Sequence, residues 1–189
     1  MNTNAHSRPR SIAIPTVRNL ENQALFYLSR YASSESGLRR VLENKLRRAA
    51  MQNPAFANDD ALQNQLHAVI DVIVEKHKKT GALDDAAFAE MKTANWRRAG
   101  RSARAIRLRL GKNGVARDLV DQALDQSAEG ENAEDAELKA ALALAKRRRL
   151  GPFRQKSSDD PDRKRKDLAA LARAGFSLDV ARKVLATRC

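Results

Sequence analysis

The chain has 189 residues with 36 Lys or Arg and 23 Asp or Glu, which give a formal net charge of +13 and an isoelectric point near 10.5. This charge favours a polyanionic partner, and nucleic acid is the commonest polyanion in a cell. No apolar run approaches the roughly 18 residues of a membrane span, and the single cysteine, Cys189, excludes an internal disulfide. We therefore expect a cytoplasmic protein that does not contact a membrane, and we expect it to be a monomer.

The first residues of the chain have the composition of a basic arm. Residues 1–19 include Arg8, Arg10 and Arg18 together with two prolines, and they contain no acid. A segment of this kind buries too little apolar surface to fold, so we expect it to be disordered. We interpret it as a solvated tail rather than as a phosphate-binding element.

Apolar periodicity and helix-end signals divide the rest of the chain into nine expected helices. Apolar residues recur every three or four positions, and Ser, Asp and Gly mark where helices begin and end. The expected helices cover residues 20–31, 35–50, 59–80, 85–98, 103–113, 117–126, 133–149, 162–174 and 177–187. Three helices per unit give repeats over residues 20–80, 81–127 and 128–189, the last of which begins with an acidic linker. The sequence predicts an all-α, elongated and curved array of three tandem three-helix, helix-turn-helix-like repeats.

The repeat is visible in the residues themselves. The block LGKNGV at residues 110–115 recurs as LARAGF at residues 171–176, with an offset of 61 positions. On the same offset Leu119 corresponds to Val180. The two blocks are therefore expected to end equivalent helices.

Helix punctuation is strongest at the centre of the chain. With Asp84 as the N-cap of the helix over residues 85–98, Leu83 and Phe88 take the N′ and N4 positions of a hydrophobic staple. Asp85 adds a second carboxylate at the positive end of the helix dipole. A metal or acid–base pair is the alternative role for the two aspartates, but no Glu, His or Cys joins them at ligand spacing. The expected caps, staple residues and helix-ending glycines are Gly81, Leu83, Asp84, Asp85, Phe88, Gly100, Ser102, Gly114, Gly175 and Ser177.

Cations concentrate in the same region. Residues 91–117 hold nine Lys or Arg and no acid, and Ile106 and Leu110 form only a narrow apolar stripe among them. We therefore expect one cationic surface, able to bind phosphates or acidic protein groups, because the Arg guanidinium fits both. The residues expected to contact such a partner are Arg39, Arg40, Arg97, Arg98, Arg101, Arg104, Arg107, Arg109, Lys112, Arg147, Arg148, Arg163, Lys164, Arg165 and Lys166.

A longer pattern resembles a known family. Its centre is the block Gly81-x-Leu83-Asp84-Asp85-x-x-Phe88-Ala89. The other matching residues are Ala24, Leu25, Leu28, Ser29, Arg30, Ser34, Leu38, Arg39, Leu42, Gly100, Ser102, Ile106, Leu110, Gly114, Val115, Gly175, Phe176 and Ser177. Over about residues 20–187 the chain resembles the RecX family, regulatory proteins of the bacterial recombinase RecA.

The resemblance implies an all-helical protein that lies along the groove of a RecA–DNA filament. It further implies that the protein restrains RecA, lowers its ATPase and strand-exchange activities, and limits filament growth during recombination, DNA repair and the SOS response. The implied partners are RecA, its nucleoprotein filament and single- or double-stranded DNA. The cations named above would then be filament contacts.

Two other interpretations remain open. A general basic DNA-binding protein would use the same arginines without any recombinase. A nucleic-acid enzyme is remote, because the chain has no Gly-rich phosphate loop and its three histidines, His6, His67 and His77, are scattered. We expect no catalytic residue, no metal site and no cofactor.

Overall fold

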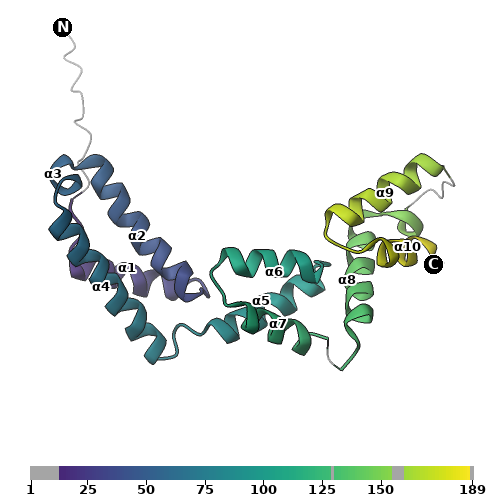
Figure 1. Cartoon of the computed structure of the whole chain (residues 1–189), viewed down its shortest axis with the longest axis horizontal. Coiled ribbons are helices and arrows are strands. Elements are labelled where there is room, and N and C mark those ends of the chain that lie inside the picture. The colour runs from purple at the N-terminus through teal and green to yellow at the C-terminus, as the bar shows by residue number, and fades with distance from the viewer. Residues whose placement is uncertain (1–12, 129, 155–159, 188–189) are drawn as a thin grey trace, which may run out of the picture. The chain divides into compact units, whose positions relative to one another are not determined.

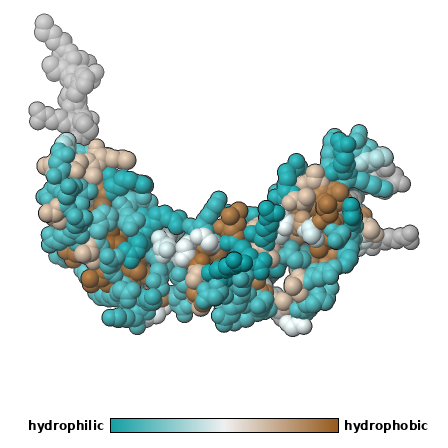
Figure 2. All heavy atoms as spheres, in the orientation of Figure 1, coloured by the Kyte–Doolittle hydropathy of each residue, from teal (hydrophilic) through white to brown (hydrophobic). Residues whose placement is uncertain are grey.

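The computed structural model describes residues 13–128, 130–154 and 160–187, which form helices joined by short turns, without a strand in these ranges (Figure 1). The expected all-α class is confirmed. By its contacts the chain divides into two compact units, Met1–Asp84 and Asp85–Cys189. Hydrophilic residues cover most of the visible face of each unit, with hydrophobic residues gathered between the helices (Figure 2).

The first unit packs around leucine side chains. Its helices are α1 (Val17–Leu28), α2 (Glu35–Gln52), α3 (Pro54–Ala57) and α4 (Asp60–Lys79). Helices α1, α2 and α4 all contact one another, and α4 lies alongside α2 (Figure 1). The predicted stripe of Leu38, Leu42 and Leu46 is buried at their centre.

The first unit differs from the sequence prediction at several helix ends and by one additional helix. Helix α1 ends at Leu28 instead of residue 31, and α2 ends at Gln52 instead of residue 50. Helix α1 begins at Val17 instead of residue 20, because Thr16 and Asn19 form a capping box in which each side chain accepts a hydrogen bond from the other's backbone N–H at 3.2 Å. Residues 17–19 are therefore helical and do not belong to an arm; residues 1–12 of that arm lie outside the described ranges. The short helix α3 was not predicted: Asn53 caps it, and its Phe56 is fully buried.

The second unit contains two clusters of buried side chains. Its helices are α5 (Asp85–Arg98), α6 (Ala103–Lys112), α7 (Arg117–Gln126), α8 (Ala133–Arg148), the 3-10 turn η1 (Gly151–Phe153), α9 (Pro161–Arg173) and α10 (Leu178–Ala186). One cluster lies among α5, α6 and α7, and the other among α8, α9 and α10. In each group the third helix packs on the first two, as α4 packs on α1 and α2. The compact units meet between Asp84 and Asp85, and the repeat boundaries at residues 81 and 128 stay predictions.

The predicted equivalence of the two repeated blocks is visible in their backbone. Leu110 and Leu171 are both fully buried. The N–H of Val115 donates to the Leu110 carbonyl at 3.1 Å, and the N–H of Phe176 donates to the Leu171 carbonyl at 3.3 Å. Gly114 and Gly175, which precede these two residues, have a positive φ. This conformation turns the following N–H groups back toward the last carbonyls of the helix, and glycine adopts it without steric cost.

Asp167 is a buried carboxylate that was not predicted from the sequence. On the 61-residue offset it stands where the second repeat has Ile106. It is 3% exposed, accepts a hydrogen bond from the Gly151 N–H at 2.8 Å and forms an ion pair with Arg154. In the group of α8, α9 and α10, Asp167 therefore holds η1 by polar contacts. In the group of α5, α6 and α7, the equivalent position is filled by the apolar side chain of Ile106.

His77 makes the first unit sensitive to acid. Burial, followed by the positive charge of Lys76, lowers the pKa of His77 below its ordinary value of 6.5, and Glu21 opposes this only in part. His77 is therefore harder to protonate in the folded state than in the unfolded state. Its contribution to the free energy of unfolding is complete above pH 6.5 and is lost as the pH falls from 6.5 through the lower pKa of the folded state. We expect His77→Gln to reduce the loss of unfolding free energy between about pH 7 and pH 5, measured by urea denaturation. His67→Gln, at an exposed position of the same helix, is the control; an equal pH dependence in both variants would contradict this role.

Candidate nucleic-acid interface

Four exposed arginines from two segments of the second unit surround one point, since Arg101 lies within electrostatic range of the other three. Arg101 precedes α6, Arg109 lies in the last turn of α6, and Arg147 and Arg148 lie in the last turn of α8. Burial, and then the positive charges of the other three, lower the pKa of Arg101 below its usual range. We call these four residues the arginine cluster. Their mutual repulsion favours a polyanion, which relieves it on binding.

The end of α5 positions the cluster. The guanidinium of Arg109 lies 5.2 Å from the centroid of the Trp96 ring, a cation–π arrangement. Arg147 donates a hydrogen bond to the Ala99 carbonyl, at the C-terminal end of α5. The backbone N–H of Arg101 donates to the Trp96 carbonyl at 2.9 Å. Three of the four cations are therefore anchored to one turn of the chain.

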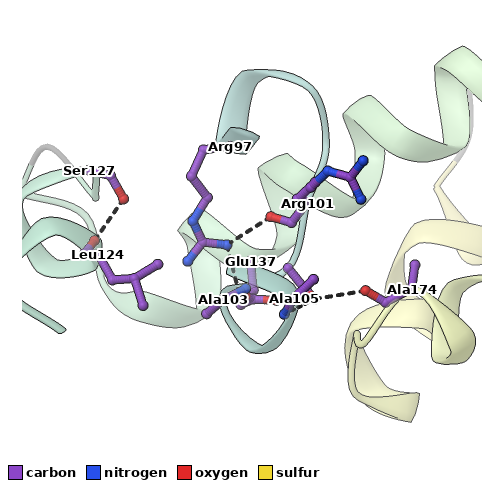
Figure 3. Close-up of polar contacts among 9 residues, drawn as sticks. Arg97, Arg101, Ala103, Ala105, Leu124, Ser127, Glu137 and Ala174 are labelled. Carbon is purple, nitrogen blue, oxygen red and sulfur yellow. Dashed lines mark hydrogen bonds and ion pairs between the residues drawn. The ribbon is translucent and has the colours of Figure 1, made fainter. Parts of the chain in front are cut away.

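Arg97 occupies a different place from the one expected for it. Its guanidinium forms an ion pair with Glu137 of α8 at 2.7 Å, and the two side chains are only 12% and 21% exposed. The same Glu137 oxygen accepts the Ala103 N–H at 2.6 Å, while the Arg101 side chain points away from this pair (Figure 3). Arg97 therefore joins α5 to α8 and is not an exposed contact. Glu137 was not predicted as part of this junction, since nothing in the sequence around it indicates a partner 40 residues earlier.

Two turns, at Gly100 and Ser102, complete this junction. We call the four residues Arg97, Glu137, Gly100 and Ser102 the interlock. A Cβ at Gly100 would lie 2.5 Å from the backbone nitrogen of Leu144, so only glycine allows the α5 turn to approach α8 this closely. Ser102 caps α6 as predicted, since its Oγ accepts the Ala105 N–H at 3.2 Å. That Oγ also donates to the Ala174 carbonyl at 2.8 Å, which ties the start of α6 to the end of α9 (Figure 3).

Arg104 and Arg107 lie apart from the arginine cluster. They line a groove of about 450 Å³ that also contains the acids Asp125, Glu131 and Glu137. Arg107 Nε lies 2.7 Å from Asp121, and this hydrogen bond holds the pKa of Asp121 below its usual range. The cations of residues 97–109 therefore face at least two environments, and only one of them is uniformly basic.

The remaining predicted contacts are distributed over other helices. Arg98 hydrogen-bonds along its own helix to Asn95 at 2.9 Å. In the first unit Arg39 forms an ion pair with Asp71, and on α9 Arg163 pairs with Asp160 at 3.4 Å. The exposed residues of this set are Arg40, Arg98, Lys112, Arg163, Lys164, Arg165 and Lys166. Their role as contacts stays a prediction.

The predicted helix-end residues are mostly where they were expected. Positive φ angles are found at Gly81 (+72°), Gly100 (+73°), Gly114 (+74°) and Gly175 (+94°). Ser177 caps α10 by accepting the Val180 N–H at 3.2 Å. Leu83 is buried in the cluster of the first unit and Phe88 in that of α5, α6 and α7. The staple between them and the capping roles of Asp84 and Asp85 stay predictions.

No group of three or more His, Cys, Asp or Glu side chains in the described ranges could hold a metal ion. None of the helices built from these residues combines the length and the apolar character needed to cross a membrane.

Comparison with known proteins gives consistent matches. The family model "RecX, second three-helix domain" matches residues 84–124, which hold most of α5, α6 and α7. "Regulatory protein RecX" of Myxococcus xanthus is 38% identical over 178 residues, covering 94% of this chain and 88% of the relative. A protein of the same name from Agrobacterium fabrum is 33% identical over 175 residues, covering 91% and 86%. A solved structure titled "Crystal structure of regulatory protein RecX" shares the fold with a TM-score of 0.58 at 20% identity, covering 89% of this chain and 72% of the other.

The interlock predicts unequal effects for two glutamates on α8. Glu137→Ala leaves the Arg97 guanidinium and the Ala103 N–H without their partner in a mostly buried place, so we expect the unfolding free energy to fall by about 2–4 kcal/mol. Glu134→Ala removes an exposed pair with Lys183 and should cost much less. Urea denaturation followed by fluorescence of Trp96, the only tryptophan, measures both. Equal losses would show that the Arg97–Glu137 pair does not hold the junction.

Proposed function

Because the chain belongs to the RecX family of regulatory proteins, we propose that it binds the RecA recombinase and its nucleoprotein filament. Binding restrains the recombinase: it lowers ATPase and strand-exchange activity and limits filament growth. In this way the protein regulates recombination and DNA repair in the cytoplasm, acting as a monomer. The observation that supports this proposal most directly is the arginine cluster, which supplies a site for the phosphates of filament DNA.

The chemistry of the cluster suits a phosphate backbone. Each guanidinium can donate two parallel hydrogen bonds to one phosphate. Contacts of this type release counterions from the DNA and carry no sequence information. A regulator of a filament that forms on any sequence needs this kind of contact. Restraint of this kind requires binding alone, so we propose no catalytic residue and no cofactor.

A general DNA-binding protein is the second candidate, and the same cluster favours it. Both candidates predict an affinity that falls steeply with salt, so salt dependence does not separate them. The discriminating property is whether the effect requires the recombinase. We therefore propose to titrate the protein into the single-strand-DNA-dependent ATPase of RecA with DNA in excess, so that competition for strands cannot imitate inhibition.

Each outcome of the titration selects one candidate. Inhibition well below one protein per recombinase monomer supports a filament regulator that acts at few sites. An unchanged ATPase rate, with DNA binding intact, overturns the regulator and leaves the general DNA-binding protein.

Charge reversal at the cluster tests which cations matter. In the full chain, Arg101→Glu with Arg148→Glu should weaken DNA binding by about tenfold or more near 0.1 M salt. The slope of log affinity against log salt concentration should fall by the equivalent of about two phosphate contacts. Inhibition of the recombinase should fall in parallel. The control, Arg173→Glu with Arg182→Glu, reverses two exposed arginines of α9 and α10 and lowers the net charge equally. Equal weakening in both variants would mean that total charge, and not the cluster, determines binding.

A further inference from the structure

The C-terminal end of α1 and the turn after it expose large apolar side chains. Leu25 is 58% exposed, Phe26 54% and Tyr31 57%, and all three lie within seven residues of the chain. The inner face of the same helix is already occupied, because Leu20 and Ala24 are fully buried in the core. The three side chains are therefore not required by the core of their own unit.

Ring contacts hold two of these side chains in place. The guanidinium of Arg30 lies over the Phe26 ring, 4.3 Å from its centroid. The rings of Tyr27 and Tyr31 are 5.3 Å apart at an interplanar angle of 40°. Side chains that are ordered before binding lose less conformational entropy when a partner covers them. Aromatic and arginine side chains are also the residue types that dominate binding energy at protein interfaces.

The charge around this end of α1 is positive. Arg30 is exposed and has no ion pair among the described residues. The one acid of the helix, Glu21, pairs with Lys76 of α4 at 3.6 Å. A partner that fits must therefore offer carboxylates beside an apolar recess.

We propose that Leu25, Phe26, Arg30 and Tyr31, the α1 patch, form a docking surface for an acidic, apolar-lined protein surface of the recombinase filament. The inference rests on the function proposed above and deepens it: the first unit makes the protein contact and the arginine cluster of the second unit makes the DNA contact. Nucleic acid is a poorer occupant, since three of the four patch residues carry no charge to release counterions. A second copy of this chain is also a poorer occupant, because it would bring Arg30 and a net charge of +13 against the same charges.

The test compares two double variants of the full chain. Phe26→Ser with Tyr31→Ser alters the α1 patch, and Met51→Ser with Val72→Ser removes two apolar side chains of the same unit that are 76% and 68% exposed. Affinity is measured for recombinase filaments assembled on DNA and, separately, for the naked DNA. We expect the patch variant to bind filaments at least about tenfold more weakly with unchanged affinity for naked DNA, and the control variant to bind both like the parent. Helical content and thermal unfolding of each variant report whether it is folded.

A single variant tests the charge of the partner. Arg30→Glu should weaken filament binding, because it places a carboxylate against an acidic surface. Arg48→Glu, at an exposed position of α2 in the same unit that is not among the predicted contacts, reports the effect of net charge.

Four outcomes overturn the proposal. Filament affinity equal to that of the parent in the patch variant removes the α1 patch as a contact while leaving the regulatory function intact. A parallel loss of naked-DNA affinity makes the patch a DNA contact, and loss of a concentration-dependent dimer makes it a self-contact. A parent chain that neither binds nor inhibits filaments rejects the proposed function itself, and the docking surface with it.

Discussion

Arg97 and Glu137 meet where the end of α5, the start of α6 and the side of α8 converge, and the basic surface of the second unit depends on this contact. The pair is mostly buried, so neither charge is left without its partner. Glu137 also fixes the first N–H of α6, and Gly100 allows the α5 turn to touch the α8 backbone. Together these contacts bring Arg101 and Arg109 from one group of helices near Arg147 and Arg148 from the next. One charged pair therefore positions four other charges.

Much of the fold could be predicted because helix signals are local. Glycines with positive φ, serine N-caps and the leucine stripes act over three or four residues, and the helices of the second unit lie close to the predicted ranges. The errors fall where the determining contact is distant or unusual. Arg97 lies in a run of cations and looks exposed until α8 supplies Glu137. Asp167 looks like a surface residue until Arg154 and the η1 backbone surround it.

The basic surface was predictable in composition but not in arrangement. A helical projection shows that Arg104 and Arg107 avoid Ile106 and Leu110, but it does not show that Asp125 and Glu131 line the same groove. Arg147 likewise comes within electrostatic range of Arg101, although the two lie more than 40 positions apart in the sequence. Local periodicity determines which side of a helix is polar, whereas tertiary contacts determine which polar side chains share a site.

The two clusters of buried side chains in the second unit have a consequence for how it folds. The clusters contain only eight and ten buried hydrophobic side chains, of which two and four are alanines, and cores of this size are marginal on their own. In an array of repeats, the free energy of unfolding of each group of helices includes a contribution from its interface with the neighbouring group. The interlock therefore couples the unfolding of α5, α6 and α7 to that of α8, α9 and α10, so that the two groups open and close as one cooperative foldon.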